Sequence, residues 1–174
     1  MLKGSDRIAI LIGLFCGLRL NETLRLQWSN FDFDKGILHV YQSKTNKTVL
    51  IPLARFLIDE LVLYKSECVG EDLFEGPDIK RGRIATYCNR FRKLFKRLGI
   101  HGVSYHTLRH SFATICSDVG SDIITTKELL NHSDITMTMR YTHKQMDVKR
   151  NTIDKVAQHI LNSNKKSLSL VSVQ

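Results

Sequence analysis

The sequence lacks several features that would place it in a common protein class. It contains no run of 18 apolar residues, so no transmembrane helix is expected. The apolar stretch 8–15 follows Asp6 and Arg7 and ends without a small-residue cleavage site, which favours a core helix over a signal peptide. No internal repeat and no long linker are present. With 174 residues, one domain is the default.

Closely spaced cysteines are also absent. The four cysteines, Cys16, Cys68, Cys88 and Cys116, lie far apart and form no C-x-x-C pair. This spacing argues against a disulfide framework or a zinc site. It predicts buried thiols in a reducing cytoplasm.

Acidic residues are missing from one long stretch. The formal net charge is +9, and no acidic residue stands between Asp78 and Asp118. A block of one sign inside a folded segment is typical of proteins that bind polyanions. The alternative is a solvated helix face, although such a face usually mixes both signs. The residues of this stretch predicted to contact a nucleic acid are Lys80, Arg81, Arg83, Arg90, Arg92, Lys93, Lys96 and Arg97.

Apolar spacing and helix-stop residues predict an α+β chain that is mostly helical with one small three-stranded antiparallel sheet. Helices are expected at 5–16, 21–27, 54–67, 84–98, 107–120, 122–130, 135–141 and 148–161. Strands are expected at 31–33, 37–41 and 48–51, which places Lys44 at a hairpin tip. In helix 107–120 the residues expected to face inward are Leu108, Phe112, Ile115 and Val119.

Two arginines are candidates for binding a phosphate. Cleavage of a phosphodiester places extra negative charge on the non-bridging oxygens, and a guanidinium presents a planar, always charged fork to two of them. Arg19 and Arg109 are the two candidate clamps. His106 precedes Arg109 by three positions at a helix start, so both side chains can reach one spot. His110 is turned away by helical spacing and is assigned to structure.

Three further residues complete a candidate site. Tyr141 can act as a nucleophile if cationic neighbours lower its pKa. Lys44 can reach into a groove and protonate a leaving 5′ oxygen. His132 lies nine positions before Tyr141 and can bond a phosphate oxygen. Each residue alone has an ordinary structural explanation, so the prediction depends on all six converging.

These residues resemble the active-site motifs of the tyrosine recombinases, the phage integrase family that includes the Xer-type enzymes. The matching stretches are Cys16-Gly-Leu-Arg-Leu-Asn-Glu22, Ser43-Lys-Thr-Asn-Lys47 with Ile51-Pro-Leu53, His106-Thr-Leu-Arg-His-Ser-Phe-Ala-Thr114, Leu129-Leu-Asn-His-Ser-Asp-Ile135 and Arg140-Tyr-Thr-His143. The resemblance covers roughly residues 8–152.

The resemblance implies an active site made of Arg19, Lys44, His106, Arg109, His132 and Tyr141. It implies that Glu22 orients Arg19, and that the reaction uses no metal and no cofactor. Two departures from the family pattern bear on local structure. Asn131 replaces a usual glycine, and asparagine tolerates the left-handed conformation, so the turn should survive. Tyr105 replaces a common proline, so the entry to its helix should be less fixed.

By resemblance, residues 1–162 are expected to form the catalytic domain of a site-specific DNA recombinase or integrase, which cuts and rejoins strands through a 3′-phosphotyrosine. The expected partner is double-stranded DNA. The protein is expected to form a homotetramer on DNA through its C-terminal segment, or to be a monomer as an isolated domain. Residues 163–174 are expected to be a tail, either a strand that packs on a neighbouring protomer or a disordered end.

The family usually has a helical clamp domain before the catalytic one, so the sequence is expected to be a piece of a longer, cytoplasmic, bacterial or phage-encoded protein that associates with the nucleoid when acting. Two rival interpretations stay open. One is a type IB topoisomerase-like enzyme, and the other is a degenerate relative that only grips DNA.

Overall fold

A computed structural model describes residues 4–42, 47–76, 79, 84–131, 136–139, 153 and 156. The elements in chain order are α1 (Ser5–Phe15), α2 (Leu20–Leu24), the 3-10 helix η1 (Trp28–Asn30), β1 (Phe31–Asp32), β2 (Ile37–Gln42), β3 (Lys47–Pro52), α3 (Arg55–Ser66), α5 (Ile84–Arg97), α6 (Tyr105–Asp118), α7 (Ile123–Leu130) and α8 (Thr136–Met139). The predicted α+β class is confirmed. The predicted helix 148–161 and the tail lie outside the described ranges, apart from Ile153 and Val156.

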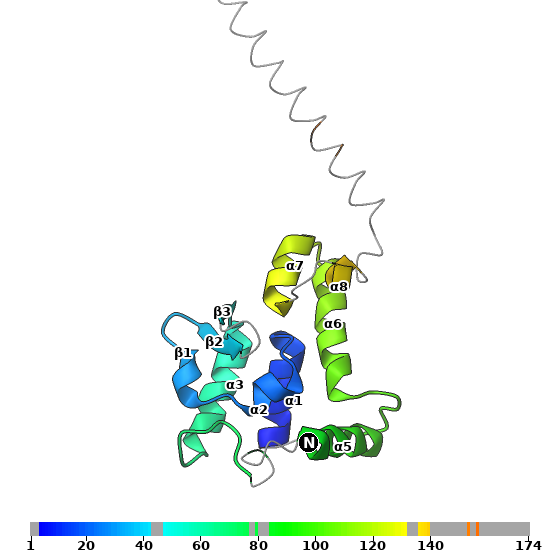
Figure 1. Ribbon diagram of the computed structural model, residues 1–174. Helices are drawn as coiled ribbons and strands as arrows, with labels where there is room; N and C mark the ends of the chain where they lie inside the picture. The colour runs from blue at the N-terminus through cyan, green and yellow to red at the C-terminus, as the bar shows by residue number, and fades with distance from the viewer. Residues whose placement is uncertain are drawn as a thin grey trace, which may run out of the picture.

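Helix α1 lies at the centre of the molecule, between α3 with the small sheet on one side and α6 on the other (Figure 1). Its residues Ile8, Ala9 and Ile12 are almost fully buried. Ion pairs from Arg7 to Glu60 of α3, and from Asp6 to Arg90 of α5, attach its first turn to two neighbouring helices. The chain therefore folds around its own N-terminal helix, and the segments before and after the sheet meet there.

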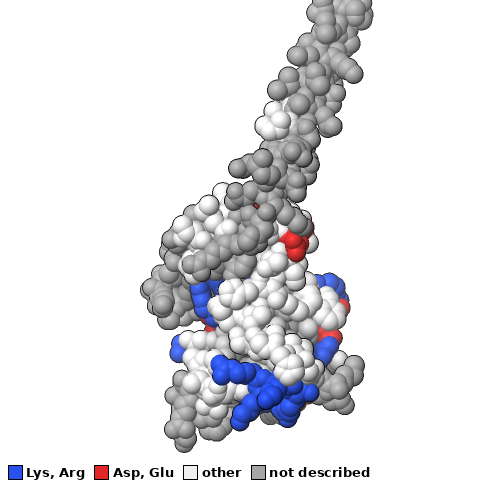
Figure 2. Space-filling model, turned by 90° about the vertical axis from the view of Figure 1, so that its right-hand side faces the viewer, with Lys and Arg blue, Asp and Glu red and all other residues white. Residues whose placement is uncertain are grey.

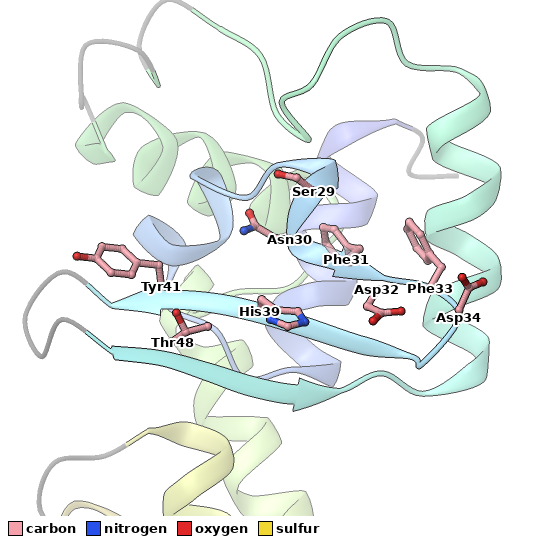
Figure 3. A pocket seen from close by; sticks show the side chains of 9 residues that line it. All are labelled: Ser29, Asn30, Phe31, Asp32, Phe33, Asp34, His39, Tyr41 and Thr48. Carbon is pink, nitrogen blue, oxygen red and sulfur yellow. The ribbon is translucent and has the colours of Figure 1, made fainter.

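The sheet has the strand order β1-β2-β3 with both pairs antiparallel. Leu38 pairs with Ile51, and both are buried in the core. The opposite face carries more polar side chains, and a hollow of about 720 Å³ lies there. Figure 3 shows Asp32, Phe33 and Asp34 at one end of this hollow and Tyr41 at the other. The described members of the predicted catalytic set, Arg19, His106 and Arg109, do not line it, so we assign it no part in the candidate site.

Helix α6 buries a different face from the one predicted. Ile115 is 49% exposed and Val119 is 76% exposed, whereas Ala113 and Cys116 are buried. At about 100° per residue, the buried face is turned by roughly 70° from the apolar stripe in the sequence. The expectation for Ile115 and Val119 was wrong because α6 packs the side that carries Arg109 against α1.

The cysteines are free thiols, but only two of the four are buried. Cys16 and Cys116 lie in the interior, Cys68 is partly exposed and Cys88 is exposed on α5. Burial raises the pKa of the Cys16 thiol to about 12, so it packs as a small apolar group. The expectation of buried thiols was therefore wrong for Cys88. Within the described ranges, none of the helices has the length and apolar content needed to cross a membrane.

Candidate active site

Arg109 is a buried cation held by backbone oxygens. Its side chain lies one turn into α6, and the residue is only 4% exposed. One terminal nitrogen donates to the carbonyl of Gly17 at 2.6 Å, just after α1, and the other donates to the carbonyl of Leu130, the last residue of α7. Carbonyl groups at helix ends carry partial negative charge, which stabilises a guanidinium there. Three segments far apart in the sequence thus fix the plane of this side chain.

Arg19 is held by Glu22, as the resemblance implied. The Glu22 carboxylate accepts a hydrogen bond from the Arg19 backbone N–H at 2.8 Å and one from its guanidinium at 3.0 Å. Arg19 is the N-cap residue of α2, so the helix begins at Leu20, one position before the predicted start. The side chain of Arg19 remains 41% exposed, so it is oriented yet reachable from solvent.

His106 lies within electrostatic reach of both arginines. Its pKa is lowered from the usual value, first by partial desolvation and then by His110, Arg109 and Arg19. The His110 ring packs edge-on against it at 4.4 Å between centroids. The lowered pKa favours a neutral imidazole at neutral pH, which can accept a proton. The structure therefore places His106 near enough to Arg19 and Arg109 for both charges to act on its ring.

Asn131 ends α7 in the left-handed conformation, with φ 48° and ψ 54°. Its backbone N–H bonds to the carbonyl of Glu128 at 2.9 Å. The expectation that asparagine would preserve this turn is confirmed. The turn also leaves the carbonyl of Leu130 at the helix end, where it accepts from Arg109.

Comparisons with known proteins identify the family of the chain. Residues 1–147 match the model of the phage integrase family. The chain belongs to the phage integrase family. This confirms the resemblance noted in the sequence.

Relatives in the phage integrase family include the tyrosine recombinase XerA of Thermococcus kodakarensis, which is 33% identical over 143 residues, or 79% of this chain and 50% of the relative. Among solved structures, the catalytic domain of bacteriophage HP1 integrase has a TM-score of 0.61 and 29% identity, over 78% of this chain and 73% of that one. The Tn1549 transposon integrase in complex with transposon right end DNA has a TM-score of 0.73 and 19% identity, over 88% and 59%. The chain spans about half the length of the curated relatives it matches.

Three predicted catalytic residues of this integrase-family chain lie outside the described ranges: Lys44, His132 and Tyr141. The same holds for Lys80, Arg81 and Arg83 of the predicted DNA-binding set. The assignments of the three catalytic residues therefore continue to depend on the sequence motifs, and those of the three basic residues on the charge pattern.

The remaining basic residues of that set lie on α5. Arg92, Lys93, Lys96 and Arg97 are exposed, and Figure 2 shows lysine and arginine gathered on the surface where α5 lies. Arg90 differs from them, because its guanidinium pairs with Asp6 of α1 at 2.9 Å and lies over the ring of Tyr87. Arg90 thus has a structural role in attaching α5 to α1.

Sequence reasoning missed how α1 and α6 approach each other closely enough for Arg109 to reach Gly17. A Cβ at Gly13 would lie 2.8 Å from the hydroxyl oxygen of Tyr105, and one at Gly17 would lie 2.6 Å from the ring of Phe112. Part of the signal was present, since a glycine within a predicted helix, as at Gly13, has no side chain and allows another backbone or side chain to approach closely.

Proposed function

We propose that this chain is the catalytic domain of a site-specific DNA recombinase or integrase, which breaks and rejoins DNA strands through a covalent 3′-phosphotyrosine. The observation that supports it is that His106 lies within electrostatic reach of both Arg19 and Arg109 in a chain of the phage integrase family. Two guanidinium groups and an imidazole near one another suit a phosphate that gains negative charge during cleavage.

In this proposal the hydroxyl of Tyr141 attacks the scissile phosphorus, and the bond to the 5′ oxygen breaks. Arg19 and Arg109 stabilise the non-bridging oxygens, while His106 and His132 assist as hydrogen-bond donors or proton acceptors. Lys44 gives a proton to the departing 5′ oxygen. Attack by a 5′ hydroxyl of a partner strand reverses these steps and joins the new strand. No metal or cofactor takes part.

Binding of double-stranded DNA is supported by the exposed basic residues of α5 and by the DNA in the structure of the similar Tn1549 integrase. We further propose that residues 1–162 form the catalytic unit, and that residues 163–174 take part in assembling a homotetramer on DNA.

The decisive experiment replaces Tyr141 by phenylalanine and uses a DNA duplex with a nick near the cleavage site, which traps the covalent product. We expect the unmodified chain to form an adduct on the 3′ side of the break, and Tyr141→Phe to form none. The matched control is Tyr64→Phe, the same chemical change in α3, which should retain the adduct. An adduct that persists in Tyr141→Phe contradicts the proposal.

A second assay separates recombination from its rivals. Joining of two DNA sites supports the recombinase, whereas relaxation of supercoils without any joining points to a topoisomerase-like activity. Tight DNA binding by the unmodified chain with no adduct at all points to a DNA-binding relative without catalysis.

A further inference from the structure

Tyr105 connects the two segments that carry the candidate arginines. It is the first residue of α6, directly before His106, and it is 2% exposed. Its hydroxyl lies 2.7 Å from the carbonyl oxygen of Ala9 in α1 and 2.9 Å from the hydroxyl oxygen of Thr23 in α2. Thr23 is fully buried, and its hydroxyl lies 3.2 Å from the carbonyl oxygen of Arg19. A chain of two hydroxyls therefore joins α6 to α1 and to the residue that caps α2.

The number of hydrogens on the two hydroxyls decides which of these hydrogen bonds can form. Each hydroxyl carries one hydrogen, and the carbonyls of Ala9 and Arg19 can only accept. The Tyr105 hydroxyl shares its one hydrogen between the Ala9 carbonyl and the Thr23 hydroxyl oxygen, and the Thr23 hydroxyl donates its own hydrogen to the Arg19 carbonyl. Burial raises the pKa of Tyr105 above its ordinary value, so the donor stays protonated across the working range of pH.

The surrounding packing is shaped around this hydroxyl. Glycine at position 13 leaves space for it, since a Cβ there would lie 2.8 Å from the hydroxyl oxygen. The ring of Tyr105 packs on Phe91 of α5 at 5.0 Å between centroids. The entry to α6 is therefore fixed by tertiary contacts, which corrects the expectation that tyrosine in place of proline would leave it less fixed.

We propose that Tyr105 is a positioning residue for the active site, whose hydroxyl holds the helix turn that carries His106 and Arg109 in register with the segment that carries Arg19. Tyr105 does not touch the reacting phosphate in this inference, and it acts through the residues beside it. The inference rests on the proposed function, because the register matters only if these three side chains share one phosphate. A displacement of about 1 Å between catalytic groups is enough to slow a reaction by about a hundredfold.

The test compares the variants Tyr105→Phe and Thr23→Val with Leu57→Val, a control in the buried core of α3 that takes no part in the hydroxyl chain. For each, the single-turnover cleavage rate at saturating DNA, the Kd for DNA and the Tm are measured. We expect Tyr105→Phe to slow cleavage at least about tenfold with an unchanged Kd, whereas Leu57→Val lowers Tm without slowing cleavage. Adding Thr23→Val to Tyr105→Phe should slow cleavage little further, because each substitution interrupts the same series of hydrogen bonds.

A cleavage rate in Tyr105→Phe within twofold of the unmodified chain overturns the inference. It is also overturned if Leu57→Val, with the same Tm as Tyr105→Phe, loses as much of its cleavage rate. Amide hydrogen exchange gives a readout that needs no activity. We expect Tyr105→Phe to speed exchange both in the first turn of α6 and in α2. Unchanged exchange in α2 overturns the inference, whether or not the unmodified chain forms an adduct. Absence of an adduct in the unmodified chain counts against the proposed function instead.

Discussion

Arg109 and the basic side chains of α5 carry the same charge in opposite surroundings. Arg109 is 4% exposed and donates to two backbone carbonyls that are 92 and 21 residues away in sequence. On α5, Arg92, Lys93, Lys96 and Arg97 are exposed. The first cation is fixed by three segments of the fold, whereas the second group projects from one surface helix.

This difference matches two different tasks. A desolvated cation with a fixed direction interacts strongly with charge that develops at one place, since few water molecules screen it. Exposed cations are screened by salt, and they attract a polyanion from any nearby direction. The buried arginine is thus suited to the chemical step, and the surface group to DNA binding.

The largest effect is expected from Arg109→Lys. An ammonium group cannot reproduce the planar fork that spans two carbonyls, so one of the buried oxygens loses its donor. We expect the free energy of unfolding to fall by about 1–3 kcal/mol, and the single-turnover cleavage rate to fall by about 10²–10³-fold. Urea denaturation and the nicked-duplex assay measure the two quantities.

The matched control for this substitution is Arg97→Lys, the same chemical change on the exposed face of α5. We expect it to alter the free energy of unfolding by less than about 0.5 kcal/mol. If both variants behave alike in stability and in cleavage, the contrast between the two regions fails.

The sequence predicted the elements better than it predicted their rotation. Apolar spacing placed α3, α5 and α7 within a residue or two of their observed bounds, because each is a local pattern. It misjudged the face of α6, where Ile115 and Val119 are exposed while Arg109 is buried. An arginine is expected on the surface because of its charge. Arg109 is buried because the carbonyls of Gly17 and Leu130, distant in sequence, accept its hydrogen bonds.

The hydrogen-bond chain through Tyr105 was unpredictable for the same reason. Its partners, Ala9 and Thr23, lie 96 and 82 residues away in sequence, and no local motif links them. By contrast, the contact from Glu22 to Arg19 spans only three residues at a helix start, and the resemblance to the family motif implied it. Local constraints on the candidate site could thus be predicted, and its tertiary supports could not.

A smaller effect is expected when charge is removed from α5 by the double substitution Lys96→Gln and Arg97→Gln. DNA affinity should fall for all sequences alike, and the slope of log K against log salt should become shallower by about 2. The matched control removes two charges elsewhere, by Lys35→Gln and Arg55→Gln. Fluorescence anisotropy at several salt concentrations measures both pairs. Equal losses from the two pairs would mean that net charge, rather than α5, accounts for binding.

The smallest effect tests whether Arg90 belongs with the exposed basic residues of α5. Arg90 lies on α5, but it pairs with Asp6 at 2.9 Å, and their side chains are 49% and 22% exposed. Because solvent screens such a pair, we expect Arg90→Gln to lower the free energy of unfolding by only about 0.5 kcal/mol. Arg97→Gln should leave it unchanged. A double-mutant cycle with Asp6→Asn isolates the pair, and its coupling should weaken in high salt. Zero coupling would contradict the structural role of Arg90. If Arg90→Gln also lost as much DNA affinity as Arg97→Gln, Arg90 would belong with the exposed DNA-binding residues of α5.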